Sequence, residues 1–167
     1  MNNKYMEQPG VYEFLFIGCD RNGINTKNKI LTYMNNMYPT TIIIDLGFKN
    51  MYPDIIKDFK KSIGKMKGHL DYNNKIGIFI GATGIEMCMC ANKIKQIRAS
   101  VCNNMNDLFT SVANHNINVL CLGSHLEHSE LINIIDGYMR LTFNNIPIHT
   151  ECVKKINIIA IVLIILY

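Results

Sequence analysis

Residues 78–87 read Ile78-Phe79-Ile80-Gly81-Ala82-Thr83-Gly84-Ile85-Glu86-Met87, and this stretch indicates the fold. An uncharged apolar run of strand length enters a turn of small residues, and a segment with helical spacing follows it. In parallel α/β sheets such a turn lets backbone N–H groups approach an oxyanion, and the helix adds its positive N-terminal end. The stretch therefore predicts where an active site lies, although the turn alone does not identify a function.

Apolar runs of strand length alternate with helix-spaced segments along the rest of the chain. Several of these runs lack polar alternation, which is typical of parallel strands buried on both faces. The segments between them are long enough to serve as crossovers, so we predict a doubly wound, three-layer α/β domain with a five-stranded parallel sheet. The predicted strands are Tyr12–Gly18, Thr41–Leu46, Lys75–Gly81, Gln96–Cys102 and Ile117–Leu122, and the predicted helices are Asn25–Met37, Asp54–Met66, Ile85–Ile94, Asn104–Asn114 and Glu127–Leu141.

Size and composition limit the class of protein. The 167 residues, 49% of them hydrophobic, suffice for one domain with a substantial core. The net charge is +4, and the lysines fall mostly on predicted helices with few aromatic residues between them, so we expect solvated helix faces and no nucleic-acid partner. The six cysteines lack the paired spacing of zinc sites, so we expect reduced thiols, no metal and a cytoplasmic location.

The two ends of the chain differ in character. The first residues lack the basic start and apolar run of a signal peptide, and we predict an N-terminal extension over residues 1–11. We assign residues 12–156 to the domain and residues 157–167 to an apolar tail. The apolar run is shorter than the roughly 20 residues that span a bilayer. We therefore expect the tail to cover apolar surface of this chain or of a second subunit rather than to contact a membrane.

Polar side chains next to the predicted strands are the candidates for chemistry. Ligands of such sheets bind beyond the carboxyl ends of the strands. A carboxylate or histidine there can move a proton, and the turn can hold an enediolate. Each residue also has a structural alternative, since Asp20 could stabilise a turn, His115 could close a helix and Glu86 could favour a helix dipole. The candidates for one common edge are Asp20, Arg21, Thr83, Glu86, His115, Asn116 and His125.

Short motifs follow one another in a fixed order over about residues 14–156. They are Gly18-Cys19-Asp20 with Gly23, Ile44-Asp45-Leu46-Gly47, Tyr52-Pro53, Thr83-Gly84-Ile85, Ala91-Asn92-Lys93, Ile97-Arg98-Ala99, Asn118-Val119-Leu120 and Leu122-Gly123-Ser124. Their order and spacing resemble the type B ribose-5-phosphate isomerase family, which is related to the galactose-6-phosphate isomerase subunits. The resemblance implies a Rossmann-like fold and a homodimer or tetramer with active sites at the subunit interface. It implies conversion of ribose 5-phosphate to ribulose 5-phosphate, in the pentose phosphate pathway, through an enediolate and without a cofactor.

By this resemblance, Asp20 binds substrate near the ring oxygen, and the Ala82-Thr83-Gly84 turn stabilises the enediolate. A histidine–asparagine pair before the fifth strand opens the sugar ring and holds a hydroxyl, either in the site of its own chain or in that of the neighbouring subunit. Without a gap the pair aligns with Asn114 and His115, and with a one-residue deletion it aligns with His115 and Asn116. Both registers remain open.

The chain also differs from the family at the position of the catalytic base. Gly81 stands where many members carry a catalytic cysteine, and Glu86 offers a carboxylate one position before that of a glutamate variant. The family's phosphate-side histidine is Arg21 here, which can bind phosphate bidentately, and its arginine after Gly-Ser is His125. Its two late arginines align with Ile148 and Cys152, and the nearby His149 and Lys154 can partly replace them. The predicted catalytic residues are Glu86, His115 and Thr83, and the predicted substrate contacts are Asp20, Arg21, Tyr52, Gly81, Ala82, Gly84, Asn114, Asn116, His125 and His149.

Three functions are therefore open. The chain is an active isomerase of ribose 5-phosphate, an isomerase of another phosphosugar, or a paralogue that binds sugar phosphate or acts as a dimeric structural protein without catalysis. The changed base, ring-opening and phosphate positions motivate the last alternative.

Overall fold

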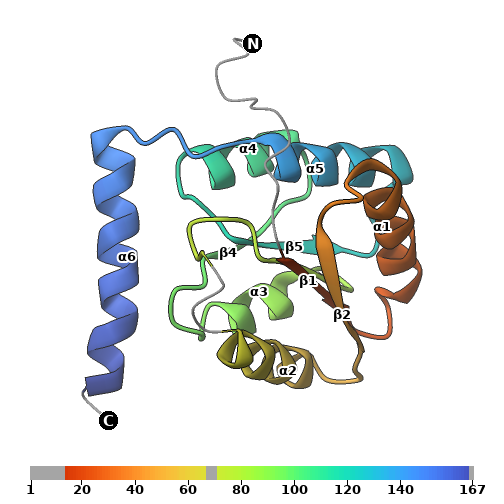
Figure 1. Cartoon of the computed structure of the whole chain (residues 1–167), viewed down its shortest axis with the longest axis horizontal. Coiled ribbons are helices and arrows are strands. Elements are labelled where there is room, and N and C mark those ends of the chain that lie inside the picture. The colour runs from red at the N-terminus through yellow and green to blue at the C-terminus, as the bar shows by residue number, and fades with distance from the viewer. Residues whose placement is uncertain (1–13, 67–70, 166–167) are drawn as a thin grey trace.

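The computed structural model describes residues 14–66 and 71–165, and these form a three-layer α/β sandwich around one sheet (Figure 1). All four pairs of neighbouring strands are parallel, and the strand order is β2-β1-β3-β5-β4. This arrangement confirms the predicted fold class. The strands are β1 (Phe14–Cys19), β2 (Ile42–Phe48), β3 (Gly77–Gly81), β4 (Ala99–Val101) and β5 (Val119–Gly123).

Helices cover both faces of the sheet because successive strand residues point to opposite sides. Leu15 and Ile17 lie in one buried cluster with the helices of one face, whereas Phe16 lies in a second cluster with those of the other. In Figure 1 the helices α1, α4 and α5 lie above the sheet, and α2 and α3 lie below it. Their bounds are α1 (Ile24–Met37), α2 (Tyr52–Lys65), α3 (Ile85–Ala91), α4 (Met105–Ala113) and α5 (His128–Arg140).

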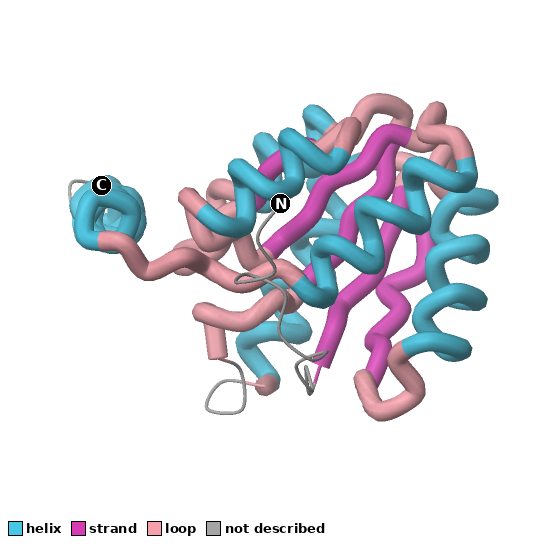
Figure 2. Tube along the Cα trace, turned by 90° about the horizontal axis from the view of Figure 1, so that it is seen from above, coloured by secondary structure: helices cyan, strands magenta, loops and turns pink. Residues whose placement is uncertain are grey.

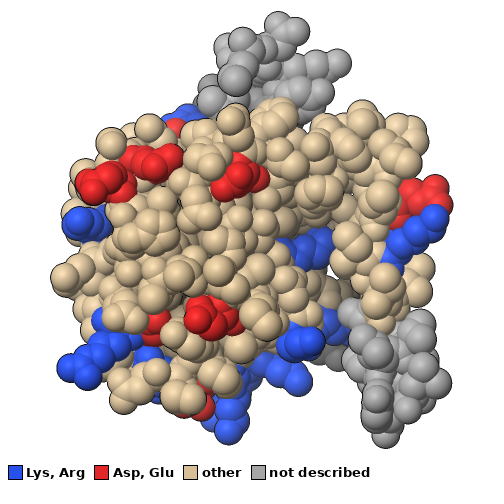
Figure 3. Space-filling view, turned by 180° about the vertical axis from the view of Figure 1, so that it is seen from behind, with Lys and Arg blue, Asp and Glu red and all other residues tan. Residues whose placement is uncertain are grey.

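The lower layer is held by an aromatic core that places α2. Phe59 of α2 packs edge to face against Phe16 and Phe79, with ring centroids 5.2 Å and 4.8 Å away. The same helix exposes its lysines, as expected for a solvated face, and basic side chains gather on this lower side of the molecule in Figure 3. Because Phe59 fixes the helix, Tyr52 at its start is fixed near the carboxyl end of the sheet.

The fourth strand is shorter than predicted. The sequence pattern predicted Gln96–Cys102, but β4 spans only Ala99–Val101. Gln96 has a φ of 67°, a left-handed conformation that interrupts an extended chain. The backbone N–H of Arg98 then donates to the Oδ1 atom of Asn118 at 2.9 Å instead of to a neighbouring strand, and the buried Arg98 side chain donates to the carbonyls of Asn116 and Tyr72, at 2.6 Å and 2.8 Å.

The C-terminal segment forms one helix that stands apart from the three layers (Figures 1 and 2). This helix, α6 (Pro147–Ile165), contains the predicted boundary between domain and tail at residue 156. Ile156 and Ile159 are 47% and 62% exposed, so this part of the helix covers little of its own chain. Within the ranges that the structure describes, none of the helices combines the length and apolarity needed to cross a membrane. The predicted extension over residues 1–11, and the last two residues of the tail, lie outside the described residues.

Candidate active site

The loop after β3 is built from main-chain groups and requires its second glycine. Gly84 has a φ of 78°, and a Cβ atom on it would lie about 2.9 Å from the backbone of Leu122. The loop is also tied to the end of β5, because the N–H of Ser124 donates to the carbonyl of Gly81 at 2.8 Å. The predicted turn is thus held rigidly between two central strands.

Two N–H groups of this loop are available to a ligand. The N–H of Ala82 donates to Asp20 at 3.2 Å, and that of Ile85 donates to the Thr83 hydroxyl at 3.3 Å. Between them, the N–H groups of Thr83 and Gly84 make no hydrogen bond within residues 14–66 and 71–165. Unpaired donors at a helix N-terminus attract negative charge, so the loop can hold an oxyanion.

Asp20 connects the end of β1 to this loop. The side chain is 2% exposed, and its two oxygens accept hydrogen bonds from the N–H groups of Gly23, at 2.9 Å, and Ala82. The turn-stabilising alternative for Asp20 is therefore present in the structure. Its Oδ2 atom would lie 3.4 Å from a Cβ atom on Gly81, so the empty position of the family's cysteine lies directly beside this carboxylate.

Glu86 lies in the first turn of α3, on the same side as Asp20 and Tyr52. The Thr83 hydroxyl donates to its carboxylate at 3.3 Å. The charge of Glu86 is the largest cause that raises the pKa of Tyr52, followed by desolvation and by the charge of Asp20. These three groups therefore share one electrostatic environment at the carboxyl edge of the sheet.

Two further predicted residues complete this edge. Arg21 is exposed directly after Asp20. The Nδ1 atom of His125 lies 3.4 Å from the carbonyl oxygen of Ala82, so the ring reaches the loop. We call this set the carboxyl-edge group, and it comprises Asp20, Arg21, Tyr52, Gly81, Ala82, Thr83, Gly84, Glu86 and His125.

The remaining predicted residues lie at the opposite edge of the sheet. Asn114, His115 and Asn116 precede β5, and residues that precede parallel strands lie at their amino ends. The expectation that His115 and Asn116 join Asp20 at a common edge is therefore wrong within a single chain. Together with His149 near the start of α6, these three residues form what we call the amino-edge group.

A chain of hydrogen bonds links His149 to Asn114. Asn144 donates from its side-chain nitrogen to the Oδ1 atom of Asn114 at 3.1 Å, and its own Oδ1 atom lies 3.0 Å from Nδ1 of His149. His115 instead is exposed and lines a separate cavity of 230 Å³ with Arg98 and Ile156. Asn144 was missed by the sequence reasoning, because no motif marks a residue in the connection between two helices.

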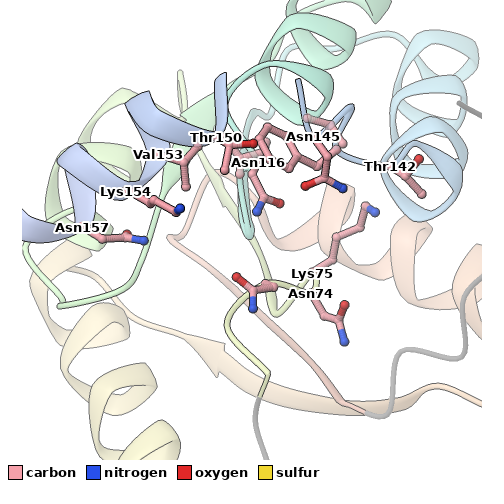
Figure 4. A pocket seen from close by; sticks show the side chains of 13 residues that line it. Asn74, Lys75, Asn116, Thr142, Asn145, Thr150, Val153, Lys154 and Asn157 are labelled. Carbon is pink, nitrogen blue, oxygen red and sulfur yellow. The ribbon is translucent and has the colours of Figure 1, made fainter. Parts of the chain in front are cut away.

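A larger cavity of 610 Å³ opens at the amino edge, between the body of the domain and α6 (Figure 4). Asn116 lines it, and so do Lys154, which the sequence offered as a replacement for a late family arginine, and Lys75, which sequence reasoning did not place in the site. Lys75 is 6% exposed and donates to the carbonyl of Leu141 at 2.6 Å. Burial lowers its pKa from 10.5 to about 8. Its position at the start of a predicted strand gave no signal of this burial.

Within the described ranges, no three or more His, Cys, Asp or Glu side chains are grouped so that they could hold a metal ion. The fold and the carboxyl-edge group are typical of α/β proteins that hold a small anionic ligand at the end of a parallel sheet. The sequence model of the Ribose/Galactose Isomerase family matches residues 15–156. The chain therefore belongs to this family of sugar-phosphate isomerases.

Individual relatives agree with this assignment but name different substrates. A Rickettsia bellii protein, named only provisionally as a sugar phosphate isomerase, is 30% identical over 134 residues, which are 77% of this chain and 88% of that protein. The D-erythrulose-4-phosphate isomerase of Pectobacterium atrosepticum is 30% identical over 124 residues, 72% of this chain and 78% of its own. The structure of Mycoplasma genitalium ribose-5-phosphate isomerase B with bound ribulose 5-phosphate has a TM-score of 0.75 at 29% identity, covering 87% of this chain and 95% of that one.

Proposed function

We propose that this protein interconverts an aldose phosphate and a ketose phosphate, with ribose 5-phosphate and ribulose 5-phosphate as the preferred pair. The observation that carries the proposal is the position of Glu86, a carboxylate beside two unpaired loop N–H groups and near Asp20. An acid–base residue next to an oxyanion site is what proton transfer through an enediolate requires.

In this mechanism Glu86 removes the proton from C2 of the open-chain aldose and returns it to C1, while the hydroxyl proton of O2 passes to O1, so that the carbonyl moves from C1 to C2. Negative charge that develops on the substrate oxygen is stabilised by the N–H groups of Thr83 and Gly84. Asp20 is already oriented by Gly23 and Ala82, so it positions the sugar near its ring oxygen without reorganisation. All of these steps use protein groups alone, so we propose a reaction without cofactor.

The proposal requires a second copy of the chain. The amino-edge group carries His115 and His149 and lies across the sheet from Glu86, too far to act on the same substrate within one chain. Apolar side chains are exposed beside the carboxyl-edge group, including Phe48, Met51, Ile85 and Met89, and α6 exposes further isoleucines. Contiguous exposed apolar surface is typical of protein interfaces. We therefore propose a homodimer in which the amino-edge group of one protomer completes the carboxyl edge of the other.

Mixing two defective variants tests this arrangement together with the activity. Glu86→Gln removes the base, and His149→Ala removes a side chain of the amino-edge group. If the variants are unfolded and refolded together, half of the dimers are mixed and hold one intact site, so about a quarter of wild-type turnover should return. Each variant refolded alone is the control. Absence of any recovery, with dimers demonstrated by light scattering, would contradict the composite site.

A catalytically impaired paralogue that binds sugar phosphate is the second candidate. It is favoured by the missing side chain at Gly81 and by the hydrogen bond that engages Glu86 with Thr83. Calorimetric titration with ribose 5-phosphate, run beside an isomerase assay, separates the two. Binding without turnover of ribose 5-phosphate, D-erythrulose 4-phosphate or galactose 6-phosphate supports the paralogue, and turnover of any of them excludes it.

We also propose a reducing, cytoplasmic location. All six cysteines lie within the described residues and none is in a disulfide.

A further inference from the structure

Two cysteine thiols meet between α3 and β5, apart from the groups that the proposed function uses. Helix α3 packs on β5, and Cα atoms of the two elements approach within 8 Å. Cys121 of β5 is fully buried, and Cys88 of α3 packs against the same apolar cluster on this face of the sheet. The thiol of Cys121 donates a hydrogen bond to the sulfur of Cys88. The two sulfur atoms are therefore direct neighbours.

The surroundings of Cys88 favour its thiolate. The backbone N–H of Val101, the residue that pairs with Cys121 in the sheet, donates to the Cys88 sulfur. The side-chain amide of Asn92 also donates to it, at 3.5 Å. The hydrogen bond from Cys121 is the largest cause that lowers the pKa of Cys88 from 9.0 to about 7, against the opposing effect of burial. At neutral pH about half of the Cys88 side chains are therefore thiolates, the nucleophilic form.

Cys121 has the opposite character. Burial raises its pKa well above the usual 9.0, and the hydrogen bond to Cys88 raises it further. Such a thiol stays protonated and is shielded from reagents in the solvent, but it can attack an oxidised sulfur that touches it. An accessible thiol of low pKa beside a resolving cysteine is the arrangement of a peroxide-sensitive site.

A small oxidant can reach Cys88 but not Cys121. Cys88 is half-buried. The side-chain nitrogen of Asn92 and the carbonyl oxygen of Ala99 lie 3.5 Å and 3.3 Å from its sulfur, and both residues line the cavity of 230 Å³. This volume holds several molecules of the size of water, and hydrogen peroxide is little larger. The cavity therefore offers peroxide a route to the more reactive of the two thiols.

We propose that Cys88 is a peroxide-reactive thiol and that Cys121 resolves it, so that oxidation links α3 to β5 by a reversible disulfide. The Cys88 thiolate first attacks one oxygen of hydrogen peroxide. The S–O bond forms, the O–O bond breaks, and hydroxide leaves with the proton that Cys88 has released, which gives water and a sulfenic acid. The Cys121 sulfur then attacks the Cys88 sulfur. The S–S bond forms, the S–O bond breaks, and hydroxide leaves with the Cys121 proton as a second water.

The electrons balance, because the two thiols lose two electrons and one peroxide gains them. Exchange with an added thiol reverses the link. This inference goes beyond the proposed function, since no sugar phosphate takes part in it.

The link lies beside the loop of the carboxyl-edge group. Cys88 follows Glu86 by two residues, and its N–H donates to the carbonyl of Gly84 at 3.0 Å. Cys121 directly precedes Leu122, whose backbone faces Gly84. A disulfide bond of about 2 Å is shorter than any contact between unbonded sulfurs, so its formation draws α3 toward β5. Oxidation therefore displaces the helix that carries Glu86.

Peptide mass spectrometry of the full chain tests the inference. The reduced protein is treated with equimolar hydrogen peroxide, its remaining thiols are blocked by alkylation, and it is then digested. The main product should be a pair of peptides joined through Cys88 and Cys121, and dithiothreitol should separate them. Cys90→Ala is the matched control and should leave this product unchanged. Cys90 lies on the same helix and is also half-buried, but among the described residues it makes no hydrogen bond to another thiol.

Two variants separate the roles of the thiols. Cys121→Ala, checked for folding by circular dichroism, should accumulate a sulfenic acid on Cys88 that dimedone traps. Cys88→Ala should leave Cys121 reduced. The rate of alkylation of Cys88 by iodoacetamide should have its midpoint at about pH 7 in the wild type and shift toward pH 9.0 in Cys121→Ala, which removes the hydrogen bond.

The inference is overturned if peroxide leaves Cys88 reduced, if Cys90 or Cys152 is oxidised in preference to it, or if Cys121→Ala leaves the midpoint of Cys88 alkylation unchanged. It is also overturned if Cys88 forms its disulfide with a cysteine other than Cys121. None of these measurements uses a substrate, so failure of the proposed function would not alter their outcome.

Discussion

The carboxyl and amino edges of the sheet are built from different kinds of groups. At the carboxyl edge, main-chain N–H groups and a positive-φ glycine form a loop that is tied to two neighbouring strands. At the amino edge, amide and lysine side chains from loops and from α6 surround a cavity. The first edge holds carboxylates and His125, and the second holds His115, His149 and the buried ammonium group of Lys75.

Under the proposed function, this difference means that one chain contributes two complementary half-sites. A proton-transfer base and an oxyanion loop suit the reacting carbons of a sugar, whereas lysines and amides suit its phosphate and hydroxyl groups. The length of the β-strands separates the halves in one protomer. We therefore expect substitutions at the two edges to have different and separable effects on the protein.

The largest effect is expected at the carboxyl edge from Glu86→Gln. Loss of a general base should lower turnover of ribose 5-phosphate by roughly 10² to 10⁴ while substrate binding persists. The measurement is kcat beside a calorimetric Kd, and Glu130→Gln on the exposed face of α5 is the control. Normal turnover in Glu86→Gln would remove Glu86 from the mechanism.

A rescue sharpens this test. The neighbours of a Cβ on Gly81 lie at 3.4 Å or beyond, so Gly81→Cys fits and returns a thiol to the position where many family members carry their base. The double variant Glu86→Gln, Gly81→Cys should turn over ribose 5-phosphate at least ten times faster than Glu86→Gln alone. Such a gain lies within the 10² to 10⁴ typical of a general base.

At the amino edge, His149→Ala should cost more activity than His115→Ala. His149 is oriented by the hydrogen bonds through Asn144, whereas His115 is exposed in a separate cavity, so only the first should transfer a ring-opening proton efficiently. We expect a loss of about 10² on ribose 5-phosphate. Erythrose 4-phosphate cannot close a furanose ring, because its O4 carries the phosphate, so its turnover should be much less affected. His128→Ala at the start of α5 is the control, and a larger loss in His115→Ala would reverse the assignment.

Gly84→Ala tests whether the loop at the carboxyl edge depends on the left-handed backbone conformation of Gly84. A Cβ atom would clash with the backbone of Leu122 and occupy a left-handed conformation, so we expect a loss of roughly 2 to 4 kcal/mol in the free energy of unfolding. Gly64→Ala is the matched control, since a Cβ atom there meets nothing within 4 Å and lies in a helix. It should stabilise by about 0.5 kcal/mol, and both values are measured by urea unfolding.

The pH dependence of the free energy of unfolding tests the cost of burying the Lys75 charge at the amino edge. Because the pKa of Lys75 is about 8 in the folded chain and 10.5 in the unfolded one, the unfolded chain binds more protons between these values. The contribution of Lys75 to stability therefore rises from about pH 8 to about pH 10.5, by a few kcal/mol at about 1.4 kcal/mol per pKa unit. Comparing the pH profiles of wild type and Lys75→Met isolates this term, because the buried cysteines and tyrosines are common to both. Parallel profiles would contradict it.

Local patterns predicted much of the fold and which residues follow the carboxyl ends of the strands. Buried strands and amphipathic helices have periods that the sequence displays, so the order of the five strands and of α1 to α5 was predicted correctly, whereas α6 was not predicted as a helix. The left-handed turn at Gln96 shortened β4, and such a turn at a residue other than glycine leaves little trace in a hydropathy pattern. The apolar tail was read as separate because its composition changes at residue 156, although the helix continues through it.

The sequence by itself determined the parallel α/β fold, the anion-holding loop and the family, because these depend on local periodicity, on glycine and on ordered motifs. Only the tertiary structure decided that Glu86 lies at the opposite edge from His115 and His149, that Asn144 connects His149 to Asn114, and that Lys75 is buried beside a cavity. Such relations depend on which strands become neighbours and in which direction they run. They are properties of the assembled sheet, and no single segment of the sequence carries them.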